Sequence, residues 1–237
     1  MSQHTIPEPH AKASGERLNK LRAGVLGAND GIVSVAATVV GVAGATVSTG
    51  PILVAGTAAV IGGALSMALG EYVSVSSQKD SEEALIEREK WELREMPDAE
   101  LEELEELYRE RGLSQATAHQ VALELTEKDA LKAHLDAELG IHEDDIANPW
   151  AAAISSALSF FVGSLLPVLA ILLPPPEWRI PVTFVAVLIA LALTGTLGAR
   201  LGETPHVARA ATRVVVGGAI ALAVTFLIGS LLGVSAA

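Results

Sequence analysis

The sequence predicts an all-α, polytopic membrane protein with five transmembrane helices and a cytoplasmic helical domain inserted between helices two and three. Half of the 237 residues are apolar, yet the formal net charge is -12, so apolar and charged residues must lie in different parts of the chain. Most acidic residues fall between Asp80 and Asp145, and the long apolar stretches after this region contain almost none. Lipid and water are therefore the two expected environments.

Five segments are long and apolar enough to span a bilayer. About 20 mainly apolar residues cross roughly 30 Å of hydrocarbon, because a helix rises about 1.5 Å per residue. Turn residues separate neighbouring segments, as in Gly50-Pro51, the three prolines 174–176, and Gly202 with Pro205. The expected spans are 23–47, 52–75, 150–173, 181–201 and 208–232.

The placement of Lys and Arg predicts the orientation, since short loops rich in these residues remain in the cytoplasm. The N-terminal segment, the 79–149 region and the loop after the fourth helix carry them, whereas the loop after the third helix has only Arg179. The N-terminus and the acidic domain are thus expected in the cytoplasm and the C-terminus outside. The segment 1–19 is polar and lacks the apolar core of a signal peptide, so we expect a disordered cytoplasmic tail. The remaining parts are 20–78 (helices one and two), 79–149 (acidic domain) and 150–237 (helices three to five).

The acidic domain is expected to consist of amphipathic helices. Helix two should continue to residue 95, because no helix breaker intervenes before Pro97. Asp98 should cap a second helix that closes at Gly112, and a third should start at Ser114. Either this helix or a fourth, short one ends at Gly140. So short a domain packs only a marginal core, and we expect a second copy of the chain to support it.

Asp30, next to Asn29, lies about two turns inside the first span. A carboxylate at membrane depth is costly and generally faces a cavity, an ion path or a partner group. The alternative is a residue at the start of the helix, at the membrane interface. Met67 and Glu71 of the second span share one face, with Met67 expected near the level of Asp30. Two carboxylates and a thioether suit a borderline transition metal such as ferrous iron, although Met67 alone is more typical of lipid-facing packing.

Two Glu-x-x-Glu repeats form a second candidate site. Carboxylates three residues apart project from one face, so two such helices folded together could enclose a metal ion. A solvated acidic surface is an equally good explanation of the same pattern. The repeats are Glu89 with Glu92 and Glu100 with Glu103, and further ligands could come from His134, Asp136 and Glu138.

Several function classes are disfavoured by composition. The chain has no cysteine, so any metal site must use carboxylate, imidazole, thioether or carbonyl ligands. Clusters of Lys and Arg that bind phosphate backbones are absent, which argues against a nucleic-acid partner. No arrangement of nucleophile and base and no phosphate-binding glycine loop supports an enzyme.

Two long motifs carry a resemblance to a known family. Residues 27–34, GANDGIVS, and residues 66–78, SMALGEYVSVSSQ, resemble the signatures of the vacuolar iron transporter family. The likeness covers the chain from about Leu18 onward and includes Glu138-Leu139-Gly140 before the third span.

This resemblance implies a homodimeric, proton-coupled exporter of ferrous iron in the lipid bilayer, without a prosthetic group. Manganese is implied as a further substrate, and cobalt and zinc remain open. The implied path runs between the two subunits, lined by Asp30 and Met67, with Asn29 beside Asp30 and Glu71 as a candidate for proton exchange. The implied metal-collecting site comprises Glu89, Glu92, Glu100 and Glu103. The family's third helix adds a Met and further Glu residues, whereas this chain reads HLDAE at 134–138.

No vacuolar targeting feature is evident and the chain is compact, so we expect a prokaryotic-type member in the cell membrane. Two alternatives stay open. One is a membrane-anchored iron store or sensor that does not transport. The other is a structural scaffold that binds no metal, which leaves Asp30 unexplained.

Overall fold

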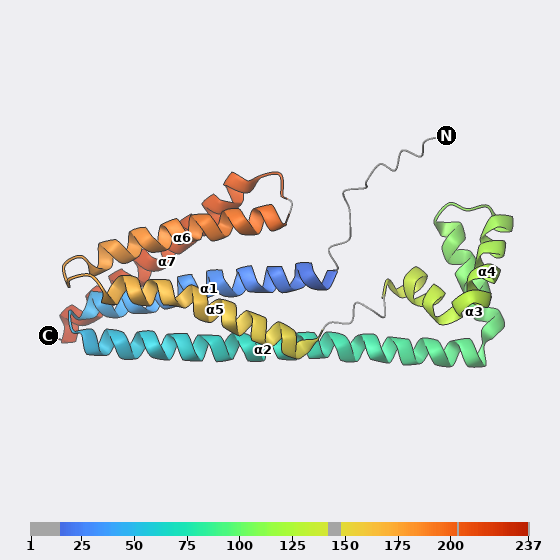
Figure 1. The fold of residues 1–237 in the computed structure, drawn as a ribbon, viewed down its shortest axis with the longest axis horizontal. Coiled ribbons are helices and arrows are strands. Elements are labelled where there is room, and N and C mark those ends of the chain that lie inside the picture. Colours follow the sequence, from blue (N-terminus) through green and yellow to red (C-terminus); the bar gives the residue numbers. More distant parts are fainter. Residues whose placement is uncertain (1–14, 142–147, 203, 237) are drawn as a thin grey trace, which may run out of the picture. The chain divides into compact units, whose positions relative to one another are not determined.

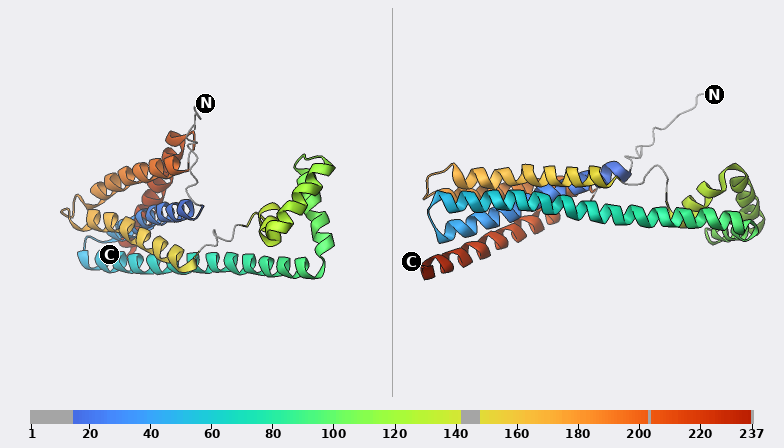
Figure 2. Two further views of the ribbon diagram at one scale, coloured as in Figure 1. Left: turned by 45° about the vertical axis from the view of Figure 1, so that its right-hand side comes forward. Right: turned by 90° about the horizontal axis from the view of Figure 1, so that it is seen from below.

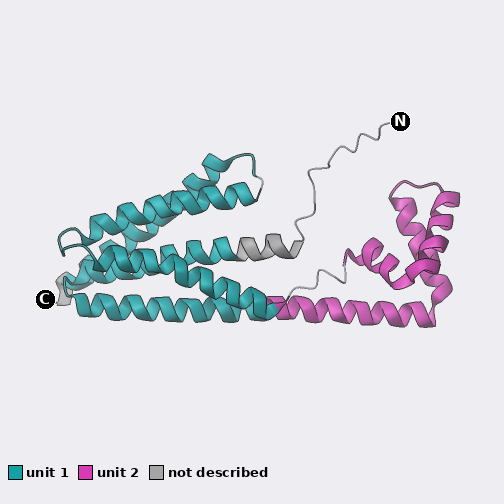
Figure 3. Cartoon of the chain, in the orientation of Figure 1, with its two compact units in different colours: residues 1–73, 149–237 teal, residues 74–148 magenta. Residues whose placement is uncertain are grey.

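The structure, a computed structural model, describes residues 15–141, 148–202 and 204–236, with side chains from residue 24 to residue 233. These residues form helices and connecting turns, and no strand occurs among them. They fall into two compact units, unit 1 (residues 1–73 and 149–237) and unit 2 (residues 74–148), coloured separately in Figure 3. The helices labelled in Figure 1 are α1 (Gly15–Ala45), α2 (Thr49–Glu95), α3 (Pro97–Glu110), α4 (Gln115–His134), α5 (Pro149–Leu172), α6 (Arg179–Leu201) and α7 (Val207–Ala236). The π-helix η1 (Leu135–Leu139) follows α4.

The five predicted spans are confirmed as helices. α1 from residue 24, α2, α5, α6 and α7 to residue 233 are each long and apolar enough to cross a membrane. α2 has 47 residues, or about 70 Å at 1.5 Å per residue, and so continues well beyond the apolar stretch that ends near Val75, as predicted. α1 begins at Gly15, so residues 15–19 are helical and not part of a disordered tail; residues 1–14 of that predicted tail lie outside the described residues.

In unit 1, α1 is the central helix and packs against α5, α6 and α7. Figures 1 and 2 both show α5 running beside α1. Glycines permit this closeness, since a Cβ on Gly163 would overlap the carbonyl oxygen of Ala28, and one on Gly229 would overlap that of Gly41. α2 differs, because no other described helix of unit 1 makes an extended backbone contact with it.

Arg179 joins the start of α6 to the connection between α1 and α2. Its Nη1 donates to the carbonyl of Val47 at 3.2 Å and its Nη2 to Oγ1 of Thr49 at 2.8 Å. The residue is 8% exposed, although its sequence position predicts an exposed loop cation. Val47 lies between the two helices, outside both, and the guanidinium supplies a donor for its carbonyl.

Unit 2 has a small core between α3 and α4. The buried residues are Leu104, Ala122, Ala133 and Ala137, with Leu101, Leu107, Tyr108 and Leu125 packed around them. Three of the buried four are alanines, so the helices lie close together. Leu85, on the extension of α2, is 41% exposed and lies outside this core.

The ends of α3 and α4 follow the predicted signals with one correction. The prediction that Asp98 caps α3 is wrong, because Met96 is the N-cap and Pro97 occupies the first turn, where its missing N–H costs nothing. Ser114 caps α4 as predicted, its hydroxyl accepting from the amide of Thr117. The last helical segment ends at Gly140, which has a left-handed φ of 62°.

α4 consists of two helical segments that meet at a kink. Asp129 has extended backbone angles inside the helix, and its Oδ1 accepts from the amide of Lys132 at 3.1 Å, which starts the second piece. The second piece then passes into the π-helix η1. The predicted fourth short helix thus corresponds to residues that follow Asp129.

We predict that Gly163→Ala lowers the thermal unfolding midpoint of the full chain in detergent. The added methyl group must push α5 away from the Ala28 carbonyl, and overpacking of this kind costs about 1 to 3 kcal/mol. Gly217→Ala in α7 is the matched control, since a Cβ there meets nothing within 4 Å. Equal midpoints for the two variants, measured by circular dichroism, would contradict the proposed close contact.

Candidate metal centre

Three buried side chains of unit 2 converge on one point. Glu89 comes from the second half of α2, Glu100 from the first turn of α3, and His134 from the end of α4. They are 2%, 5% and 0% exposed, and each offers a ligand atom within 4.8 Å of the other two. Nδ1 of His134 lies 3.1 Å from Oε1 of Glu89 and 3.6 Å from Oε2 of Glu100. Glu138, one helical turn beyond, places its Oε2 3.9 Å from the same nitrogen.

The cluster leaves polar atoms without hydrogen bonds. Oε1 of Glu89 and both ring nitrogens of His134 are buried and have no hydrogen-bond partner among the described residues, despite the short distance between two of them. Buried polar atoms of this kind are costly unless another group satisfies them. A cation bound between the oxygens and Nδ1 would satisfy two of the three atoms.

The electrostatics of the cluster favour a cation in the same place. Burial raises the pKa of Glu89 to about 7, with the charges of Glu138 and Glu100 acting in the same direction. Burial also raises the pKa of Glu100 and of Glu138, and the charge of Glu103 adds to both shifts. Burial lowers the pKa of His134, so its imidazole is neutral and keeps a lone pair for a metal ion. Oxygen and imidazole ligands without thiolate are a donor set that fits divalent transition metals.

The π-helix carries the histidine side of the site. η1 widens the turn that follows His134, and π-turns occur often at functional sites. Two contacts fix this segment: the guanidinium of Arg111 donates to the carbonyl of Ala137, and the amide of Ile141 donates to the carbonyl of Leu135 at 2.9 Å. The ring of His134 is therefore held by its backbone as well as by burial.

The remaining predicted ligands lie farther from the centre. Glu92 is half-buried and its Oε1 forms an ion pair with Arg88 at 3.0 Å. Glu103 is exposed and acts on the buried carboxyls through its charge. Asp136 is exposed on η1 and is not in the buried group. Of the seven predicted ligands, the structure brings Glu89, Glu100 and His134 together, with Glu138 beside them.

The predicted pathway residues lie in unit 1. Asp30 is exposed on α1, and neighbouring Asn29 accepts a hydrogen bond from Oγ1 of Thr194 at 3.3 Å. Met67 is half-buried on α2 and packs against the core of the unit, so it is not only lipid-facing. Glu71, one turn further along, is also half-buried. No hydrogen bond or ion pair between described residues joins Asp30 to Met67 or Glu71.

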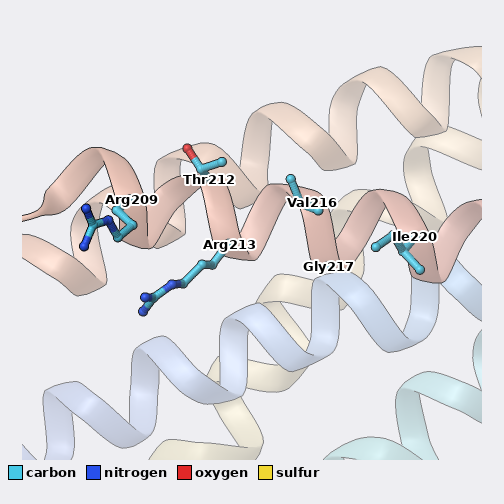
Figure 4. A pocket seen from close by; sticks show the side chains of 6 residues that line it. All are labelled: Arg209, Thr212, Arg213, Val216, Gly217 and Ile220. Atoms are coloured by element: carbon cyan, nitrogen blue, oxygen red, sulfur yellow. The ribbon is translucent and has the colours of Figure 1, made fainter.

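A groove of about 540 Å³ lies on α7 and is lined by residues of that helix alone, shown in Figure 4. Arg209 and Arg213 stand at one end, and Val216 and Ile220 at the other. Guanidinium groups have no lone pair for a cation, so this groove lacks the chemistry of a metal site.

Sequence reasoning placed His134 among secondary ligands, although it is the most buried member of the cluster. Spacing within a helix relates Glu89 to Glu92 but carries no information on which face of α4 meets α2 and α3. The role of Arg111 in holding η1 was not predicted either, because no motif distinguishes this residue from a surface arginine.

Five apolar helices and an inserted acidic unit with a buried carboxylate and imidazole cluster define the class: a polytopic helical membrane protein with the donor set of a divalent-cation site. The sequence profile of the VIT family matches residues 21–230, nearly the whole chain. The chain therefore belongs to the VIT family. This is a family of transporters and not of enzymes, in agreement with the sequence prediction.

Similar proteins span most of the chain. A protein named vacuolar iron transporter from Acanthamoeba castellanii is 48% identical over 212 residues, which cover 89% of this chain and 78% of that protein. Vacuolar iron transporter homolog 2.1 of Arabidopsis thaliana is 35% identical over 222 residues, covering 93% and 85%. Vacuolar iron transporter homolog 1 of Oryza sativa subsp. japonica is 36% identical over 218 residues, covering 92% and 75%.

The raised pKa of Glu89 predicts that metal-free unit 2 loses stability as pH rises through about 7. The folded state holds this proton more tightly than the unfolded chain, so the contribution is complete below pH about 4.5 and lost above 7. His134 acts in the opposite direction, but only below its ordinary value of 6.5. The loss between pH 6.5 and 8.5 therefore comes from the buried carboxyls, with Glu89, whose pKa is about 7, as the main contributor.

This loss can be measured as a fall in the urea unfolding midpoint, reported by the fluorescence of Trp91. The protein is the full chain with Trp150 and Trp178 replaced by Phe, and a chelator keeps it free of metal. Glu89→Gln should show a smaller loss over the same window, because it carries no titrating group at this position. A midpoint of the parent protein that stays constant from pH 6.5 to 8.5 would refute the assignment.

Proposed function

We propose that this protein transports ferrous iron out of the cytoplasm, with manganese as a further substrate, by exchange against protons. The observation that carries the proposal is the group formed by Glu89, Glu100 and His134, which are buried, close together and incompletely hydrogen-bonded. Ordinary solvated acidic helices keep their carboxylates in water, so this burial favours a cation site over a solubility role. The names of the relatives supply iron as the first substrate to test.

In this proposal the two candidate sites act in succession. The carboxylates of unit 2 collect hydrated metal, and Asp30 with Met67 holds it inside the membrane. The pKa of Glu89, about 7, lies where a proton and a metal ion compete for one carboxylate near neutral pH. Glu71 is the candidate for passing protons in the opposite direction, since it lies one helical turn from Met67.

A homodimer is part of the same proposal. Asp30 is exposed in a single chain, and a carboxylate facing lipid without compensation is strongly disfavoured. A second copy that covers this face would surround Asp30 with protein. α2 supports the idea, because its exposed apolar residues Ile61, Leu65 and Leu69 share one face and the rest of unit 1 leaves that face open.

For location we propose the cell membrane, with the N-terminus and unit 2 in the cytoplasm and the C-terminus outside. The alternation of Lys and Arg between successive loops supports this orientation. The relatives are named as vacuolar proteins, in which the same orientation would move metal from the cytoplasm into the vacuole.

Asp30→Asn should abolish proton-driven ferrous iron uptake into proteoliposomes, because the amide keeps the shape of the side chain and loses the charge that holds the metal. An unchanged thermal unfolding midpoint in detergent, measured by circular dichroism, would show that unit 1 of this variant is folded. Thr212→Ala, at the exposed groove on α7, is the control and should transport normally. Normal flux in Asp30→Asn would remove Asp30 from the mechanism, whereas metal binding without flux in the parent protein would favour a store or sensor.

Leu65→Cys should form a disulfide-linked dimer under mild oxidation in the membrane, because Leu65 lies on the proposed dimer face of α2. The chain has no cysteine of its own, so any disulfide must join the two introduced residues. Leu193→Cys on α6 is equally apolar and 67% exposed, and serves as the control for random collisions. Gel electrophoresis without reductant reports the outcome. Equal cross-linking of the two variants would argue against a dimer interface on α2.

A further inference from the structure

His134 differs from every other member of the cluster because it offers nitrogen. Its Nδ1 lies within 4 Å of oxygens from three carboxylates, those of Glu89, Glu100 and Glu138. A cation placed between these oxygens also meets Nδ1, and the imidazole is 0% exposed, so water does not replace it. The coordination sphere of the metal would then contain at least one nitrogen.

We propose that His134 determines metal specificity in unit 2, favouring borderline transition metals over cations that prefer oxygen alone. This inference rests on the proposed function, since it assumes that the cluster binds the transported metal. Sites built from carboxylates suit magnesium, calcium and manganese, whereas imidazole suits iron, zinc, copper and nickel. Replacing one oxygen by an imidazole nitrogen therefore tilts the selection toward ferrous iron, cobalt and zinc.

The position of the ring is fixed strongly enough for this role. His134 is the last residue of α4 and the N-cap of η1, and the contacts of Arg111 and Ile141 hold the segment that follows. The ring is fully buried, so it has little room to turn away from the carboxylates. The nitrogen is thus part of the site for every metal that enters, and each metal binds according to its affinity for nitrogen.

The outer nitrogen of the ring limits how tightly the metal is held. With a metal on Nδ1 the proton resides on Nε2, which is buried and has no hydrogen-bond partner among the described residues. Histidine ligands usually donate this proton to a carboxylate or carbonyl, which raises their basicity and the metal affinity by about 10- to 100-fold. Without that partner, His134 selects by ligand type while binding remains weak enough for release, as a transported ion requires.

The test compares three full-length proteins in detergent: the parent chain, His134→Asn and His119→Asn. Asparagine places an amide oxygen near the position of Nδ1, so His134→Asn exchanges nitrogen for oxygen with little change in shape. His119 is an exposed histidine of the same unit, paired with Glu105 at 2.9 Å, and controls for removal of any imidazole. Competition with a fluorescent chelator gives the affinities for Zn²⁺, Co²⁺, Mn²⁺ and Mg²⁺.

We expect His134→Asn to weaken the binding of Zn²⁺ and Co²⁺ by about 10- to 100-fold and to change the binding of Mn²⁺ and Mg²⁺ by less than about threefold, so that the selectivity ratio falls at least about threefold. The visible absorption bands of bound Co²⁺ should shift in this variant and stay unchanged in His119→Asn. Retained Mn²⁺ binding shows that the variant is folded.

An equal loss of affinity for all four metals, or an unchanged selectivity ratio, would overturn the role of His134. Neither result would contradict the proposed transport function. A parent protein that binds none of the four metals would instead overturn the metal site on which the proposed function depends. Loss of Mn²⁺ binding in His134→Asn but not in His119→Asn would also count against the inference. Such a loss would mean that His134 is needed for the structure of the site and not for the choice of metal.

Discussion

The buried carboxylates of Glu89 and Glu100 impose the main constraint on this molecule. Two acidic groups removed from water and placed near each other are unfavourable when charged, and no Lys or Arg side chain of the described residues forms an ion pair with either. Protonation relieves the cost at low pH, and under the proposed function a divalent cation would relieve it at neutral pH. The long extension of α2, the short α3 and the π-helix all serve to hold these groups together.

Unit 1 depends on the packing of apolar helices in lipid. Lipid offers no hydrophobic gain for bringing apolar helices together, so packing depends on close backbone approach, which glycines such as Gly163 and Gly229 provide around α1. α2 shares little of this packing, and its apolar side chains are left for lipid or for another protein surface. Close backbone packing thus holds unit 1 together, whereas unit 2 combines a small apolar core with buried carboxylates.

Much of this architecture could be predicted from sequence because the signals are local. The spans follow from apolar length, and Ser114 and Gly140 mark helix ends by their own chemistry. The cap of α3 was misassigned because Asp98 and Pro97 are both start signals, and the proline fixes the earlier position. The central place of His134 could not be predicted, since it depends on the kink at Asp129, which changes the face that the end of α4 presents. The same holds for Arg179, whose partners are more than a hundred residues away.

The distance in sequence between Arg179 and its partners has a consequence for biogenesis. Val47 and Thr49 precede the arginine by 132 and 130 residues, so the first helical hairpin is synthesised long before the guanidinium that fastens it. Until Arg179 at the start of α6 has been synthesised, the turn of that hairpin lacks these two hydrogen bonds. Unit 1 therefore gains this contact only late in translation, after its third span has been made.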